Sequence, residues 1–166
     1  MKKLLLITLA MVSVLVFSTD SLAAKVEVKW TNPDKYRDIY AGDENRKAFR
    51  ERLFKIFEKH FAKLASKLPE NQTLKVEVLD VDLAGDVNYG SINRIRILKD
   101  LYFPRFKFTY QLVDAKGKVL VSGEENLKDM NYLYTNNLRY NNESFGYDKR
   151  MIEGWFNKTF KTRFVK

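Results

Sequence analysis

The stretch RFKFTYQLVDAKGKVLVSGEENL, residues 105–127, carries the clearest signal for the fold. Large apolar side chains occupy every second position of its first half, at Phe106, Phe108, Tyr110 and Leu112. This alternation predicts a strand with one buried and one exposed face. Residues 114–117, DAKG, read as a tight turn, because the glycine accepts the positive φ that such a turn needs. Residues 119–127 are therefore expected to return as an antiparallel partner strand.

The chain around this hairpin predicts three more strands and two helices. The strands are expected at residues 25–30, 73–83 and 92–98, and the helices at about 43–68 and 148–162. Asp43 is the expected N-cap of the first helix, since its carboxylate can accept hydrogen bonds from the free N–H groups of the first turn. Within residues 73–83 the apolar positions change phase after Val78. This change indicates either a β-bulge or burial on both faces.

These elements predict the fold class. Short links between the late strands favour antiparallel pairing, and each helix has one apolar side to bury. We expect an α+β fold with a largely antiparallel sheet of about five strands and two helices packed on one of its faces. The expected order is strand, helix, strands, helix. A single domain is expected at residues 24–166, because a chain of about 140 residues buries enough surface to sustain one core.

Residues 1–23 have the features of a cleavable signal peptide. Lys2 and Lys3 precede an almost unbroken apolar run at residues 4–17, and Ser21 and Ala23 place small side chains where cleavage occurs. The run is shorter than the roughly 20 residues that span a bilayer, so an uncleaved anchor is the less favoured alternative. We expect cleavage after Ala23 and a periplasmic protein, or a secreted one, without a transmembrane segment.

The composition narrows the kinds of partner and chemistry. Of the 30 Lys and Arg and the 21 Asp and Glu, the signal would remove Lys2, Lys3 and Asp20, which leaves 28 against 20 and a net charge of about +8. This charge favours anionic partners, which in the periplasm are lipid head groups, lipopolysaccharide phosphates, anionic glycans or acidic proteins rather than nucleic acid. The lack of cysteine excludes disulfides, lipoprotein attachment, thiolate catalysis and Cys-ligated zinc.

Several segments together resemble one protein family. They are NPDKY at 32–36, DVDLAGD at 80–86, IRILKD at 95–100, GEENLKDM at 123–130 and FGYDKR at 145–150. Nearly the whole chain after residue 23 resembles an uncharacterised family of Gram-negative envelope proteins, catalogued as domain of unknown function 3016. The resemblance implies export and a single domain, and it implies no activity and no site.

A basic sheet face is the first candidate binding surface. Arg94 and Arg96 point one way on one predicted strand, and Arg105 and Lys107 point one way on the next. If these strands pair with their apolar residues toward the helices, four cations share the open face and can bind phosphates or carboxylates. The alternative is a solvated face whose cations protect it from aggregation.

The Tyr- and Asn-rich segment at residues 131–147, called here the Tyr/Asn loop, is the second candidate surface. Its candidate ligand-binding residues are Tyr132, Tyr134, Asn136 and Tyr140. Aromatic faces beside amide groups suit sugar rings or extended peptides, and long loops often carry function. The alternative is a simple connection whose tyrosines cover the sheet.

An acidic cluster is the third candidate site. Asp80 and Asp82 lie two residues apart on a predicted strand, so their side chains share a face, and Asp86 follows closely. Clustered carboxylates of this kind are the ligands that Mg²⁺ and Ca²⁺ prefer. The alternative is structural: Asp80 pairs with an arginine such as Arg94 or Arg96, while Asp82 and Asp86 cap turns.

These features favour binding over catalysis. The single histidine, His60, lies beside the apolar side of the first predicted helix, and no Ser or Cys nucleophile motif accompanies it. We expect a non-enzymatic periplasmic binding or accessory protein, without a cofactor, that engages an anionic envelope component or a partner protein. The alternative is a divalent-metal-binding protein or metal-dependent hydrolase that uses Asp80, Asp82 and Asp86. A third class is a structural envelope protein that acts through its apolar surface. No feature of the sequence predicts an oligomeric state.

Overall fold

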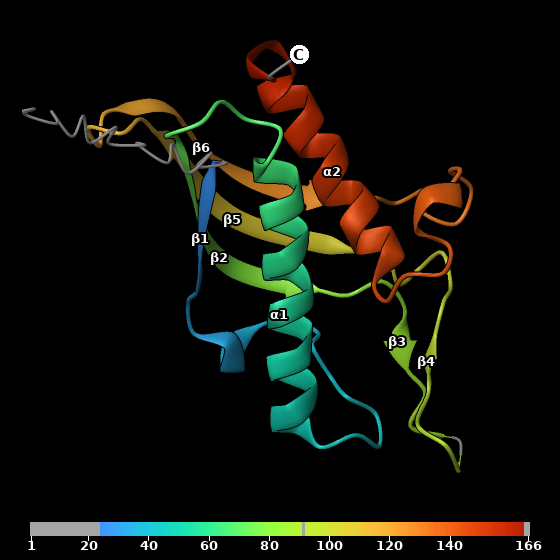
Figure 1. Cartoon of the computed structure of the whole chain (residues 1–166). Helices are drawn as coiled ribbons and strands as arrows, with labels where there is room; N and C mark the ends of the chain where they lie inside the picture. Colours follow the sequence, from blue (N-terminus) through green and yellow to red (C-terminus); the bar gives the residue numbers. More distant parts are fainter. Residues whose placement is uncertain (1–23, 91, 165–166) are drawn as a thin grey trace, which may run out of the picture.

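The computed structural model of the chain describes residues 24–90 and 92–164, and the predicted signal peptide lies outside them. The strands are β1 (Lys25–Trp30), β2 (Thr73–Asp82), β3 (Asp86–Val87), β4 (Arg96–Ile97), β5 (Arg105–Val113) and β6 (Val119–Lys128). The helices are α1 (Arg46–Ala65) and α2 (Gly146–Phe160), with 3-10 turns η1 (Pro33–Lys35), η2 (Leu138–Tyr140) and η3 (Lys161–Arg163). Figure 1 shows their arrangement, which confirms the α+β class. No helix among the described residues has the length and apolar character needed to cross a membrane.

The main sheet has four strands in the order β1-β2-β5-β6, and it is mixed, with one parallel and two antiparallel pairings. β1 runs parallel to β2, because α1 connects them and carries the chain back to the end of the sheet where β1 began. β5 pairs antiparallel with both β2 and β6. The strand expected at residues 92–98 is reduced to β4, which pairs with β3 in a separate two-stranded ribbon. Residues 84–104, which contain this ribbon, are called the arm.

β2 contains a β-bulge at Leu79. Its pairing with β5 shifts by one residue between Val78 and Asp80. Val78 and Val81 are both fully buried, so the bulge lets the apolar side chains return to the core face after the shift. Of the two explanations for the change of phase in this segment, the bulge is therefore confirmed.

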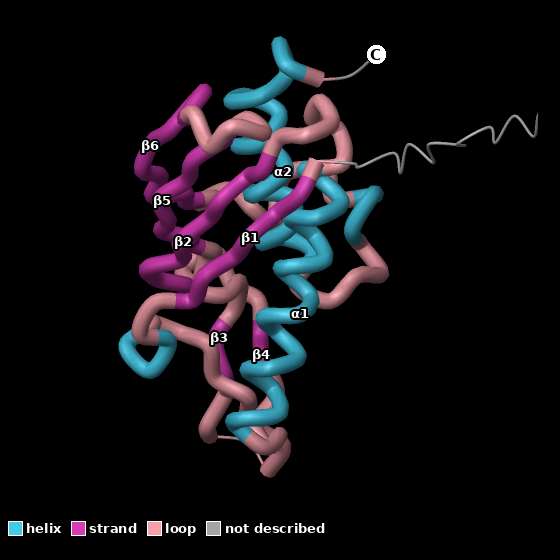
Figure 2. The backbone as a smooth tube through the Cα atoms, turned by 60° about the vertical axis from the view of Figure 1, so that its left-hand side comes forward, coloured by secondary structure: helices cyan, strands magenta, loops and turns pink. Residues whose placement is uncertain are grey.

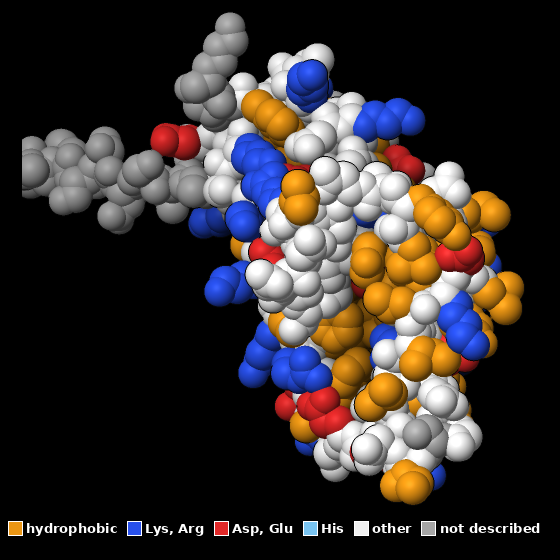
Figure 3. Space-filling view, turned by 90° about the vertical axis from the view of Figure 1, so that its right-hand side faces the viewer, with side chains coloured by type: hydrophobic (Ala, Val, Ile, Leu, Met, Phe, Trp, Pro, Cys, Tyr) orange, Lys and Arg blue, Asp and Glu red, His pale blue; other side chains and the backbone are white. Residues whose placement is uncertain are grey.

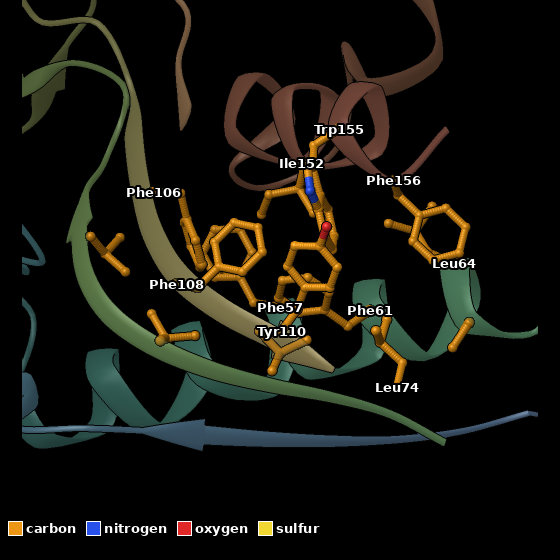
Figure 4. Packing of buried hydrophobic residues seen from close by; sticks show 14 of the residues in the cluster. Phe57, Phe61, Leu64, Leu74, Phe106, Phe108, Tyr110, Ile152, Trp155 and Phe156 are labelled. Carbon is orange, nitrogen blue, oxygen red and sulfur yellow. The ribbon is translucent and has the colours of Figure 1, made fainter. Parts of the chain in front are cut away.

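Both helices cover the same face of the main sheet, as the two views in Figures 1 and 2 show. The core between these layers is rich in aromatic side chains. Figure 4 shows Phe57 and Phe61 of α1, Phe106 and Phe108 of β5 and Trp155 of α2 converging there. The rings of Trp155 and Phe108 meet edge to face with their centroids 4.7 Å apart, and those of Phe57 and Phe106 lie 5.3 Å apart. Each such side chain buries a large apolar area, so this contact holds the helices on the sheet.

Both helices begin at residues other than those expected. Asn45, not Asp43, is the N-cap of α1, and its side-chain oxygen accepts hydrogen bonds from two N–H groups of the first turn at 3.0 and 3.1 Å. Asp43 instead accepts a 2.8 Å hydrogen bond from the backbone N–H of Arg94, which ties the arm to the entry of α1. α2 begins at Gly146, two residues earlier than predicted.

Candidate functional site

The structure does not bring together the four cations of the predicted basic face, Arg94, Arg96, Arg105 and Lys107. Arg105 and Lys107 lie on the open face of the main sheet, which the helices leave uncovered. Arg94 and Arg96 lie in the arm. The expectation of four cations on one face is therefore wrong, because the segment at residues 92–98 pairs with β3 and does not join the main sheet.

The open face is also balanced in charge. Four ion pairs lie on it, Lys29–Glu77 at 2.8 Å, Lys107–Glu124 at 3.0 Å, Lys75–Glu27 at 3.6 Å and Arg105–Asp82 at 3.7 Å. A shallow hollow of about 550 Å³ crosses this face, and residues of these pairs line it. The first three are exposed and add little stability, at about 0–1 kcal/mol each, whereas Asp82 of the fourth pair is only 19% exposed. These pairs do cancel the positive charge that was expected to attract an anion.

Of the three aspartates in the predicted acidic cluster, Asp80 and Asp82 lie beside the same arginine, and Asp86 lies apart from them. Asp80 accepts a 2.8 Å hydrogen bond from the backbone N–H of Arg37, and the guanidinium of Arg37 lies 3.6 Å from Asp80 and 3.7 Å from Asp82. Asp86 lies in β3, outside the main sheet. Within the described part of the chain, no three His, Asp or Glu side chains are grouped so that they could hold a metal ion. The geometry therefore favours the structural alternative, in which Asp80 pairs with an arginine. The partner is Arg37 and not Arg94 or Arg96.

The Tyr/Asn loop packs against the arm and α2. Tyr132 is fully buried, and its hydroxyl donates a 2.9 Å hydrogen bond to a backbone carbonyl of the arm. Tyr140 is also buried, and its hydroxyl donates to the carboxylate of Glu153 at 2.7 Å. Tyr134 and Asn136 are exposed. Two of the four predicted ligand residues thus cover the protein interior, and two face solvent.

Arg150 of α2 holds the Tyr/Asn loop in place, a role that the sequence analysis missed. Its guanidinium donates to the backbone carbonyls of Thr135 at 2.6 Å and Tyr132 at 3.0 Å. It also donates to the carboxylate of Asp129 at 2.7 Å. One side chain therefore fixes both the start and the middle of the loop.

A cavity of about 450 Å³ lies between the arm, the Tyr/Asn loop and the start of α2, and we call it the α2 cavity. Its lining includes the side chains of Tyr40, Phe49, Arg52, Arg94, Arg96, Asn137, Tyr140, Asn141, Glu143, Phe145, Tyr147 and Asp148, and Glu143 is paired with Lys149 at 2.7 Å. Figure 3 faces this side of the molecule, where the surface is hollowed and hydrophobic side chains surround the hollow. Its size is that of a small-ligand site. Arg94 and Arg96 of the predicted basic face and Tyr140 of the predicted loop site all line this cavity.

Three arginines line the α2 cavity, and they differ in their freedom to bind a ligand. Arg96 is mostly buried and donates to both carboxylate oxygens of Asp38, at 2.7 and 3.0 Å. Arg52 forms an ion pair with the carboxylate of Glu44 at 2.6 Å. Arg94 is about half exposed, and its nearest carboxylate, that of Asp43, lies 3.7 Å from its Nε. Arg94 is therefore the cation of the cavity with the most capacity for an anion.

α2 begins at the wall of the cavity without a side-chain cap. Its N-cap, Phe145, has φ 56° and ψ 39°, a left-handed conformation that is rare for a residue with a side chain. Gly146 follows because a Cβ atom at that position would collide with the carbonyl oxygen of Tyr140. The N–H groups of the first turn give this wall a partial positive charge, which adds to that of Arg94.

Asp148 is the most deeply buried titratable group of the cavity wall. Its carboxylate accepts a 3.1 Å hydrogen bond from the backbone N–H of Ala84, where the arm begins. Burial raises the pKa of this carboxyl to about 7, against the opposing effects of that hydrogen bond and of the charge on Arg96. Asp148 thus anchors α2 to the arm and helps to shape the cavity.

Comparison with known proteins places the chain in a family. Residues 24–158 match the family model described as a protein of unknown function (DUF3016). The chain belongs to this family. None of the curated proteins and none of the solved structures compared matches the chain significantly. The match confirms the resemblance read from the sequence segments, and the DUF3016 region contains the main sheet, the arm, the Tyr/Asn loop and the whole α2 cavity.

One signal in the sequence could have indicated the cavity wall of this DUF3016 protein. Asp148 lies four residues before Ile152 and seven before Trp155, so it falls on the apolar stripe of α2. An acidic residue on such a stripe is rarely buried without a specific partner. Arg94 and Phe145 carry no comparable local signal, because the contacts that bring them to the cavity join segments far apart in the chain.

Proposed function

We propose that the protein is a non-enzymatic binding module of the periplasm, and that it engages an anionic envelope component in the α2 cavity. The observation that carries this proposal is the position of Arg94. This side chain lines a cavity of small-ligand size and is about half exposed, and among the described residues its contacts are a carboxylate at 3.7 Å and the ring of Tyr89 at 5.8 Å. A phosphate or carboxylate can occupy its guanidinium in the bidentate manner that arginine favours.

The rest of the lining supports a ligand that carries sugar as well as charge. Tyr40 and Tyr147 contribute aromatic rings, and Asn137 and Asn141 contribute amides. The side-chain oxygen of Asn137 is buried and has no hydrogen-bond partner among the described residues, so a turn of this amide toward the cavity would let it accept a hydrogen bond from a ligand hydroxyl. A phosphorylated or acidic sugar of an envelope glycan combines these features. The periplasmic location is proposed from the signal-peptide features of residues 1–23.

The metal-dependent alternative has no comparable support. Asp86 lies in the arm, apart from Asp80 and Asp82, and Arg37 already pairs with those two carboxylates. A carboxylate that is paired with arginine and separated from its expected co-ligand is a poor starting point for cation binding.

Calorimetric titration with deacylated lipopolysaccharide, a phosphorylated oligosaccharide without lipid chains, tests the proposal. We expect binding that weakens with added salt and falls at least about tenfold in Arg94→Gln, since one lost charge-assisted contact is worth about 1.4 kcal/mol or more. The matched control is Lys107→Gln, which removes a cation from the open face and should bind as the wild type does. Lack of binding by the wild type, or equal weakening in both variants, would contradict the proposal.

A further inference from the structure

Large apolar side chains are exposed along one side of the molecule, on the arm and the Tyr/Asn loop. Six of them define what we call the apolar band, Tyr89, Ile92, Ile95, Leu101, Tyr134 and Leu138. Their exposed fractions run from 59% to 99%. Figure 3 shows hydrophobic side chains gathered along this side. Single exposed apolar residues are ordinary on a protein surface, whereas a gathering of this size indicates a surface that meets another body.

The two segments that carry the band are joined by hydrogen bonds. The hydroxyl of Tyr134 donates to the carboxylate of Asp100 at 2.6 Å, and the hydroxyl of Tyr132 donates to the backbone carbonyl of Lys99 at 2.9 Å. Arg96 ties the arm to the segment before α1. The band is therefore presented by a braced surface and not by two independent loops.

Cations without acidic partners flank the band. Lys99 in the arm and Lys128 at the end of β6 are exposed, and neither forms an ion pair with another described residue. The carboxylate of Asp100, next to Lys99, accepts a hydrogen bond from the hydroxyl of Tyr134 and keeps its negative charge, so Lys99, Lys128 and Asp100 together carry one net positive charge. The ammonium groups of Lys99 and Lys128 can thus contact the anionic groups of another surface.

We propose that the apolar band docks on the surface of an anionic phospholipid bilayer. Ile92, Ile95 and Leu101 enter the boundary between head groups and acyl chains, and Lys99 and Lys128 meet lipid phosphates. Exposed aliphatic side chains, tyrosines and flanking lysines form the combination that binds membrane interfaces, because each matches one layer of the interface. This activity goes beyond binding in the α2 cavity.

Co-sedimentation with vesicles tests the docking, with protein purified after expression of the full chain. Vesicles of phosphatidylethanolamine and phosphatidylglycerol in a 3:1 ratio should sediment the wild type, and added salt should reduce this binding. The double variant Ile92→Asp, Leu101→Asp should bind at least about fivefold less, since it places charge in the apolar layer. The matched control is Val119→Asp, an exposed apolar position at the start of β6 and outside the band, which should bind as the wild type does.

Several outcomes would overturn the docking proposal. They are failure of the wild type to sediment, equal sedimentation of the double variant, and equal binding to vesicles of phosphatidylcholine alone. If circular dichroism shows that the double variant is unfolded, Lys99→Gln with Lys128→Gln tests the same surface and should weaken binding to the anionic vesicles. Asn141→Ala changes the lining of the cavity without changing its charge and should sediment normally, which separates this proposal from ligand binding in the cavity. Cross-links from the band to a periplasmic protein, without vesicle binding, would replace the membrane with a protein partner.

Discussion

Arg96 in β4 donates hydrogen bonds to both carboxylate oxygens of Asp38, at 2.7 and 3.0 Å. The same guanidinium donates to the carbonyl of Gly85 at 2.6 Å and to that of Tyr40 at 3.2 Å. It therefore joins the arm to the segment between β1 and α1. The side chains of Arg96 and Asp38 are only 18% and 11% exposed, so removing one leaves the other without its opposite charge in a poorly solvated place.

The first prediction concerns this pair. Arg96→Ala should lower the free energy of unfolding by about 3 kcal/mol, because it leaves the buried carboxylate of Asp38 unpaired. Denaturant unfolding followed by tryptophan fluorescence measures the loss. The matched control is Arg94→Ala, which is also in the arm. Arg94 is about half exposed and lies 3.7 Å from Asp43, so its removal should lower the free energy of unfolding by about 0.5 kcal/mol or less. Equal losses in the two variants would show that the Arg96 pair has no special role.

The second prediction concerns the anchoring of the Tyr/Asn loop by Arg150. Arg150→Met keeps an apolar side chain but removes the hydrogen bonds to Thr135, Tyr132 and Asp129. The amides of residues 129–137 should exchange with deuterium at least about tenfold faster, and stability should fall by about 2 kcal/mol. Lys158→Met removes an exposed cation from the same helix and serves as the control. Unchanged exchange in the Arg150 variant would mean that other contacts hold the loop.

Local patterns predicted the four strands of the main sheet and both helices, but they missed β3 and did not give all of the strand pairings. The alternation in residues 105–113 and the turn at 114–117 predicted the β5–β6 hairpin, which the structure contains. Alternation is the same in parallel and antiparallel strands, so it could not orient β1 relative to β2. The order strand, helix, strand held the missing information, since a helix between two strands favours their parallel pairing.

The candidate site was less predictable, for a different physical reason. The alternation around Arg96 showed which side chains share a face of that strand, but it could not show which strand is its partner. Pairing with β3 moved Arg94 and Arg96 from the main sheet to the α2 cavity. That cavity joins the entry of α1, the arm and the start of α2, and no local pattern reports contacts at such separations.

The third prediction concerns pH and His60, which α1 places in the interior. This residue is 5% exposed, and its Nε2–H donates to the carbonyl of Lys149 at 3.0 Å. Burial is the main cause that lowers its pKa from 6.5 to about 4. The folded state therefore binds this proton less tightly than the unfolded state does. The contribution of His60 to stability is complete above about pH 6.5 and is lost as the pH falls from there toward 4.

His60→Gln keeps an N–H donor but cannot titrate, so it should remove this loss on acidification. The wild type contains an opposing group, because the raised pKa of Asp148 makes the folded state the better proton binder between about pH 4 and 7. The informative quantity is therefore the difference in unfolding free energy between variant and wild type, which cancels the effect of Asp148. This difference should stay constant from pH 8 to 6.5 and then move in favour of the variant toward pH 4. A difference that is the same at every pH would mean that His60 is protonated equally in the folded and unfolded states.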